Sequence, residues 1–173
     1  MGFFSNIALR GKFNQKLMNV STHRNKLLMT EIERQSVHPF FSIIPMYLGA
    51  FYQGVMKDDN AKKFFEIMAE ATEQQIDAVN RLLTVWFFWS TDRLMNIKVI
   101  EDESVTLGFS KIWSLSNIEF NNLVSFLDSC SQGEDILYLW GKIEEVLNRG
   151  NRSPEFVLPH IRNAMVSVLK NGS

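Results

Sequence analysis

Cysteine is nearly absent from this sequence, since Cys130 is the only one among 173 residues. A single thiol excludes an intramolecular disulfide and a thiolate metal cluster of the Cys-x-x-Cys kind, so we expect a reducing compartment. The first twenty residues also lack the unbroken apolar run of a secretory signal, because Arg10, Lys12 and Lys16 interrupt it. Together these absences predict a cytoplasmic protein.

Motifs for metal, cofactor and phosphate binding are missing as well. His23, His38 and His160 are far apart in the sequence, and no His-x-x-x-His or Glu-x-x-His pair involves them. The glycine patterns of the P-loop and of dinucleotide-binding folds do not occur either. We therefore expect no metal site, no cofactor and no enzymatic activity, and we interpret Cys130 as an inert thiol.

Charge of neither sign dominates, because the net charge is −1, but the charges are unevenly distributed. Residues 1–57 contain seven Lys and Arg against Glu31 and Glu33, which leaves −6 for the rest of the chain. We interpret the basic part mainly as a solvated face, with peripheral contact to an anionic membrane as the alternative. No cluster of Lys and Arg is dense enough to predict nucleic-acid binding.

One long stretch has no charged residue: residues 35–56 contain neither Lys, Arg, Asp nor Glu. A transmembrane helix needs about 20 apolar residues, but Pro39 and Pro45 interrupt this stretch and Gly49 and Gly54 weaken it. We therefore predict no transmembrane segment. We expect an extended segment that leads into a short helix after Pro45, buried in the core on nearly all sides.

Most of the remaining sequence has apolar residues at the three- and four-residue spacing of amphipathic helices. The longest such pattern starts near Asn60, after a cap at Asp58 or Asp59, and continues at least to Phe88, which predicts a central helix longer than about 40 Å. Over residues 97–108, two β-favouring runs predict a small hairpin or an exposed loop. Further helices are predicted over 3–18 and 21–35, after capping boxes at Ser116 and Ser131, and in a final region from Ser153.

These patterns predict an all-α fold, in which a single helical domain over residues 1–173 contains about six to eight helices. Residues 1–20 are expected to form an amphipathic N-terminal arm of this domain. The predicted central helix also carries a stripe of carboxylates, which we interpret as its solvated outer face rather than a site for a divalent ion or a basic partner. The stripe consists of Glu66, Glu70, Glu73 and Asp77.

The sequence is rich in side chains that suit contact surfaces, with 14 Phe, 4 Trp, 3 Tyr and 8 Met. Because no reactive group of residues accompanies them, this composition favours a non-enzymatic helical interaction protein: an adaptor, regulator or inhibitor of another protein. The amphipathic arm is the segment most expected to dock on a partner protein or on a second copy of this chain. Its candidate contact residues are Phe3, Phe4, Ile7 and Met18.

An alternative function is that of a carrier or sensor of a small apolar ligand. Its cavity is expected between residues 39–54 and the tryptophan-rich tract LLTVWFFW, residues 82–89. The candidate lining residues are His38, Tyr47, Tyr52, Trp86 and Trp89.

Overall fold

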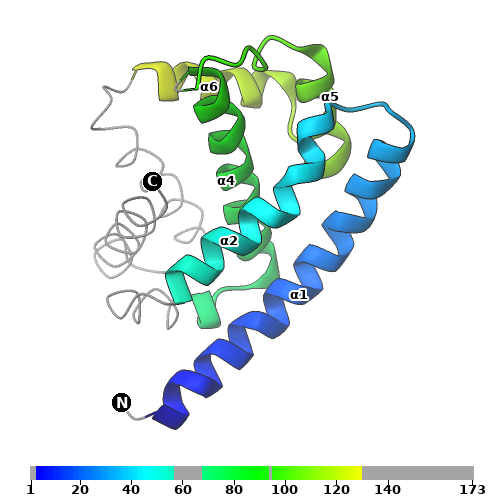
Figure 1. The fold of residues 1–173 in the computed structure, drawn as a ribbon. Coiled ribbons are helices and arrows are strands. Elements are labelled where there is room, and N and C mark those ends of the chain that lie inside the picture. The colour runs from blue at the N-terminus through cyan, green and yellow to red at the C-terminus, as the bar shows by residue number, and fades with distance from the viewer. Residues whose placement is uncertain (1–2, 57–67, 94, 130–173) are drawn as a thin grey trace.

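The computed structural model describes residues 3–56, 68–93 and 95–129 of the chain. Its elements are helix α1 (Phe3–Glu33), the 3-10 helix η1 (Pro39–Ile43), α2 (Ile44–Met56), α4 (Glu73–Arg93), α5 (Glu103–Trp113) and α6 (Asn117–Ser129). These three ranges contain no strand, so the predicted all-α multi-helix fold is confirmed. Figure 1 shows the long α1 along one side of the molecule, α2 crossing α4, and α5 and α6 together at one end.

Helix α1 is one continuous helix of 31 residues, so the prediction of two helices that meet at Ser21 is wrong. The buried face does not break at Ser21, because Phe13, Val20 and Leu28 recur about every two turns and are 0, 7 and 2% exposed. Ser21 therefore lies inside the helix and is not an N-cap. The residues of the predicted arm, as far as they are described, form the first part of α1.

The uncharged stretch folds into η1 and α2. Where an extended segment was predicted, His38 caps the 3-10 helix, because its Nδ1 accepts a hydrogen bond of 3.1 Å from the Phe40 amide. Pro45 lies in the first turn of α2, where the missing amide hydrogen costs little. This helix is buried on one face only, since Tyr52 is 2% exposed whereas Met46 is 73% exposed. The predicted burial on nearly all sides is therefore wrong.

Helix α4 is central to the described fold, but it begins later than predicted. The chain leaves the helical conformation at Ala71 and Thr72. Thr72 then caps α4 in a reciprocal pair: the Gln75 amide donates to Thr72 Oγ1 at 3.1 Å, and the Thr72 amide donates to Gln75 Oε1 at 2.8 Å. This Thr-x-x-Gln capping box is visible in the sequence and marks a start that hydrophobic periodicity does not reveal. With 21 residues, α4 is about 32 Å long. Residues 60–67 of the predicted helix lie outside the described residues.

Of the two alternatives predicted for residues 97–108, a hairpin or an exposed loop, the hairpin does not form: residues 97–102 are a loop, and α5 begins at Glu103. The amides of Val99 and Ile100 each donate to the Asp92 carboxylate at 2.8 Å, instead of pairing with a second strand. Asp102 then caps α5 by accepting a hydrogen bond of 2.9 Å from the amide two residues further on. The β-favouring side chains serve the core, because Val99 is 2% and Ile100 7% exposed.

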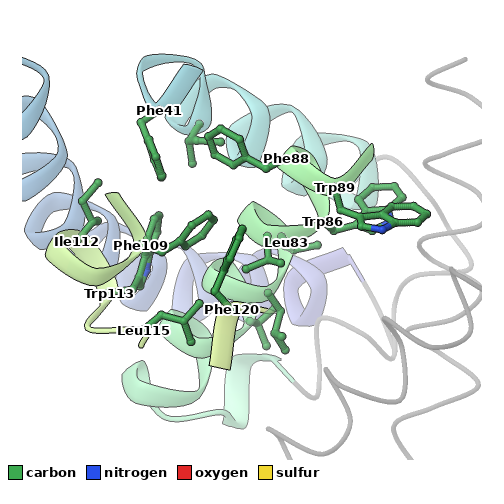
Figure 2. Close-up of a cluster of buried hydrophobic side chains, with 14 of the residues drawn as sticks. Phe41, Leu83, Trp86, Phe88, Trp89, Phe109, Ile112, Trp113, Leu115 and Phe120 are labelled. Carbon is green, nitrogen blue, oxygen red and sulfur yellow. The ribbon is translucent and has the colours of Figure 1, made fainter. Parts of the chain in front are cut away.

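Aromatic rings from four elements form the centre of the core (Figure 2). Phe41 of η1, Phe88 of α4, Phe109 of α5 and Phe120 of α6 are all 0% exposed. Their ring centroids lie 4.7 Å apart for Phe41–Phe88, 5.6 Å for Phe88–Phe109 and 5.1 Å for Phe109–Phe120. Inclined ring pairs at such distances are favourable beyond the area that they bury. This aromatic cluster fixes α5 and α6 against α4.

Of the two hydrogen bonds of the capping box predicted at Ser116, the one to the serine is present: Ser116 Oγ accepts a hydrogen bond of 3.1 Å from the Glu119 amide. Helix α6 begins directly after Ser116, at Asn117. Other predicted features lie outside the described residues: the capping box at Ser131, the helical region from Ser153, and the side chains Cys130 and His160.

Candidate functional site: a polar cleft across α5 and α6

The chain turns sharply from α5 into α6 at Ser114 and Leu115. Ser114 has a left-handed backbone with φ 55°, its amide donates to the Ser110 carbonyl at 3.0 Å, and the Leu115 amide donates to the Phe109 carbonyl at 3.2 Å. The bond from the left-handed Ser114 to Ser110 is the 5→1 bond of an αL C-cap, and the two bonds together satisfy carbonyls at the end of the helix. Leu115 is only 2% exposed, so the turn is anchored in the core and holds the two helices side by side.

The surface where α5 and α6 meet is hollowed by two clefts of about 620 and 480 Å³. Glu103, Thr106 and Asn117 line both clefts, so the two are adjacent, and we call them together the α5–α6 cleft. Hydroxyl and amide groups, which can donate and accept hydrogen bonds, are carried by half of the residues that line it. They belong to Ser36, Ser104, Thr106, Ser110, Asn117, Asn121 and Ser125.

At one end of the cleft, Arg93 is held between two carboxylates. Its Nε and Nη2 donate to Asp128 at 2.8 and 3.0 Å, and its Nη1 donates to Asp92 at 2.6 Å. The hydrogen bonds to Asp128, together with those to Asp92, outweigh desolvation and raise the pKa of Arg93. Trp89 also donates to Asp128, at 3.0 Å. This network ties the end of α4 to α6, so we interpret Arg93 as a structural wall of the cleft and not as an anion-binding group.

The pKa values of both carboxylates in this network are lowered. For Asp128 the largest cause is the hydrogen bond from Arg93. For Asp92, burial raises the pKa of the carboxyl, but the amides of Ile100 and Val99 and the neighbouring Arg93 outweigh it. Both groups are therefore ionised at neutral pH, and both contribute to holding α4, α6 and the loop between α4 and α5 together.

The cleft combines apolar contact with negative charge. Leu107 lines it and is 42% exposed, and Ile118, next to the lining residue Asn117, is 75% exposed. Glu101 and Glu103 lie in its walls and form no ion pair among the described residues. Within the same part of the chain, no group of three or more His, Cys, Asp or Glu is placed to hold a metal ion. Hydrogen-bonding groups around an exposed apolar side chain are typical of surfaces that bind polypeptides.

The cleft residues were not predicted from the sequence, because the start of α5 was expected to be a hairpin or a loop. The signal for the helix is nevertheless present: Asp102 followed by Glu103 is the pattern of an N-cap and an acidic first turn. A helix that starts there places Thr106 and Ser110 one turn apart on one face. The partner wall on α6 depends on tertiary packing, which no local pattern reveals.

The predicted contact residues of the N-terminal segment lie on α1. Ile7 and Met18 are 51 and 62% exposed, and Met29, eleven residues after Met18, is 51% exposed. Eleven residues make three helical turns, so the three side chains share one outer face of α1. Phe3 and Phe4 lie in the first turn of the same helix.

Basic side chains of α1 and the predicted carboxylate stripe meet in a contact between helices. The prediction that both are solvated faces holds only in part, because Lys12 and Glu70 are 49 and 58% exposed at their side chains, whereas Arg24 and Asp77 are 25 and 20% exposed. Lys12 Nζ lies 2.8 Å from Glu70, Asn19 donates to Glu73 at 2.8 Å, and Arg24 Nη2 lies 2.7 Å from Asp77. Lys16 donates to the Ala71 carbonyl at 2.8 Å and to the Ala69 carbonyl, at the break before α4. We call this contact the α1–α4 seam. Lys12, Lys16 and Arg24 are bonded in this seam, so they are less available to contact an anionic membrane. Glu66, the remaining residue of the predicted stripe, lies outside the described residues.

The five residues predicted to line an apolar cavity are spread through the core. Ring centroids lie 4.7 Å apart for His38–Phe40, 5.0 Å for Tyr47–Phe87 and 5.3 Å for Tyr52–Phe13. Figure 2 shows Trp86 and Trp89 together at one end of the aromatic cluster, away from Phe41. None of the five lines the α5–α6 cleft. The Tyr47 hydroxyl and the Trp86 indole N–H are buried and find no hydrogen-bond partner among the described residues. The cavity itself stays a prediction.

No protein-family model, curated protein or solved structure matches this chain. Among the described helices, none is both long and apolar enough to cross a membrane. What the protein does is therefore argued from the geometry of the α5–α6 cleft.

Proposed function

We propose that this protein is a non-enzymatic helical interaction protein, an adaptor, regulator or inhibitor, that binds a segment of a partner protein in the α5–α6 cleft. The observation that carries the proposal is the cleft itself, which combines hydroxyl and amide groups with the exposed Leu107 in its lining. On sequence grounds we place the protein in the cytoplasm, because a single cysteine suits a reducing compartment.

The walls of the cleft suit an extended polypeptide. An extended segment presents one amide donor and one carbonyl acceptor per residue, and a surface that binds it must satisfy both kinds of group. Ser110 on α5 and Asn117 and Asn121 on α6 can each supply a donor and an acceptor. Thr106 supplies an acceptor, because its hydroxyl donates to the Glu103 carbonyl at 3.0 Å. The walls therefore suit a bound backbone of any sequence, and specificity is left to the side chains.

The cleft is built on rigid elements, which favours binding. Phe109 of α5 and Phe120 of α6, both 0% exposed, anchor the two helices in the core, and the turn at Ser114 joins them. A surface that is already formed avoids part of the entropy cost of ordering on binding. The outer face of α1, with Ile7, Met18 and Met29, is our second candidate surface, for another protein or for a second copy of this chain.

Site-specific photo-crosslinking tests the proposed function. The crosslinking residue p-benzoylphenylalanine replaces Leu107 in one full-length variant and Met46 in another, because Met46 is 73% exposed but lies on α2, outside the cleft. After irradiation in a lysate of the source cells, we expect a discrete adduct from position 107 and none of the same mass from position 46.

A cleft-filling variant makes this test specific. Ser110→Trp, combined with the crosslinker at position 107, places an indole in the cleft and is expected to remove the adduct. Circular dichroism checks that the variant keeps its helical content, since Ser110 is exposed. An adduct that survives Ser110→Trp, or one that also forms from position 46, would contradict binding in the cleft.

A further inference from the structure

The charged side chains that line the α5–α6 cleft are mostly acidic. Three carboxylates, those of Glu101, Glu103 and Asp128, stand against a single guanidinium, that of Arg93. Arg93 and Asp128 are bonded to each other through two hydrogen bonds of 2.8 and 3.0 Å, and Arg93 also binds Asp92. The charge that remains for a ligand is therefore the charge of Glu101 and Glu103.

These two carboxylates are exposed and lack an ion-pair partner among the described residues. On α5 the cation Lys111 lies 3.3 Å from Glu31, and Arg34 lies 3.6 Å from the same carboxylate. The cleft is thus negative where Glu101 and Glu103 lie. Near Ser36, which donates to the Glu31 carboxylate, the negative charge of Glu31 is neutralised by Lys111 and Arg34.

From this charge distribution we propose that the segment bound in the α5–α6 cleft is a cationic extended peptide of a partner protein, with a Lys or Arg at the Glu101–Glu103 end. The inference rests on the proposed function and adds the chemistry of the partner. An ammonium or guanidinium group placed there gains charge-assisted hydrogen bonds to carboxylates that none of the described residues pairs.

The spacing along α5 also fixes where the peptide carries an apolar side chain. Glu103 and Leu107 line the same cleft and are one helical turn apart, about 6 Å along the axis. In an extended chain, residues i and i+2 point to the same side and lie about 6.7 Å apart. The bound segment therefore has the pattern basic–any–apolar, in either chain direction, with the basic residue at Glu103 and the apolar residue at Leu107.

Peptide selection tests this proposal without knowledge of the partner. A random seven-residue library displayed on phage is selected on the full-length protein at low ionic strength, with counter-selection on Ser110→Trp. We expect enriched peptides in which Lys or Arg lies two positions from Leu, Ile, Val, Met or Phe. With a synthesised enriched peptide, the double variant Glu101→Gln, Glu103→Gln should bind about five- to tenfold more weakly at low salt, with a smaller difference at 0.5 M salt.

Glu119→Gln is the matched control, because it removes one exposed carboxylate of α6 that does not line the cleft. Its affinity for the peptide should equal that of the unchanged protein. Enriched peptides that are acidic or uncharged but still compete with crosslinking at position 107 would overturn the cationic partner and leave the proposed function standing. If no peptide is enriched over Ser110→Trp, both the inference and the proposed binding of an extended segment fail.

Discussion

At the scale of a single residue, Gly108 is the position on which the core packing depends most directly. It lies on α5 against the ring of Phe41, and a Cβ atom added there would lie 2.3 Å from Phe41 Cε2 and 2.5 Å from Cζ. Real Cβ atoms do not approach carbon atoms so closely, and Phe41 is fully buried between Phe88 and Phe109. The absence of a side chain at Gly108 therefore allows the aromatic cluster to close.

We expect Gly108→Ala to destabilise the protein. Alanine at a helix interior normally stabilises by about 1 kcal/mol relative to glycine, whereas overpacking a core costs about 1–3 kcal/mol, so a net loss of about 1 kcal/mol is expected. Gly11→Ala and Gly49→Ala are matched controls, because a Cβ there meets no atom within 4 Å, and both should gain stability. Urea unfolding of the three variants measures the effects, and shifts of the same sign in all three would contradict this account.

Single residues also show which local signals the sequence carries reliably. The role of Ser116 as a helix cap was predicted from the sequence, and the reciprocal cap of Thr72 and Gln75 follows the same rule. Gly108 was not predictable, because its close contact with Phe41 joins residues 67 positions apart in the chain. Caps are local in sequence, whereas the space available to a side chain is set by tertiary packing.

At the scale of helices, the α1–α4 seam shows why predicted surfaces became contacts. Hydrophobic periodicity identifies the apolar face of each helix and leaves the rest as solvent-exposed by default. On α1 and α4 the two polar faces are complementary, so cations of one helix meet carboxylates of the other. Arg24 is the most embedded member, because it forms two bonds to Asp77, of 2.7 and 2.8 Å, and donates to the Ile112 carbonyl of α5.

We expect Arg24→Met to cost more than Lys12→Met, although each removes one cation from the seam. Arg24 and Asp77 are 25 and 20% exposed at their side chains, whereas Lys12 and Glu70 are 49 and 58% exposed. Removing Arg24 leaves the Asp77 carboxylate and the Ile112 carbonyl without this donor, for an expected loss of about 2 kcal/mol, against less than about 1 kcal/mol for an exposed pair. Thermal unfolding of both variants compares the two, and equal losses would show that the seam acts only through long-range charge.

At the scale of the whole molecule, fold class and interaction site differ in how far the sequence predicts them. The all-α class follows from helical periodicity, which each segment displays by itself. The α5–α6 cleft exists because the left-handed turn at Ser114 and the contact of Phe109 with Phe120 place two helices side by side. Ser114 has a positive φ without being glycine, so even the turn lacks its usual sequence signal. The cleft therefore depends on contacts that no single segment contains.

The molecule as a whole should lose stability in acid, because several carboxylates that join its elements have lowered pKa values. Asp92 and Asp128 join α4 to α6 and to the loop before α5. In Asp102 the hydrogen bonds from Ser104 are the largest cause of the lowered pKa, and in Glu31 it is the hydrogen bond from Ser36. All four carboxyl groups therefore bind a proton less readily in the folded protein than in the unfolded chain.

The sign of the effect follows from this difference. A carboxyl whose pKa is lower when folded contributes its full stabilisation above the unfolded-state value of about 4, and loses it as the pH falls through the folded-state value. We expect urea unfolding curves to coincide between pH 7 and 5.5 and to show falling stability from about pH 4 downward. Asp128→Asn should be less stable than the unchanged protein at pH 7 and should lose less on acidification, because one of the titrating groups that anchor Arg93 is gone. Unchanged stability between pH 6 and 3 would mean that the pKa values of these carboxyl groups are the same in the folded and the unfolded chain. The hydrogen bonds between Arg93 and its carboxylates would then not stabilise the wall of the cleft.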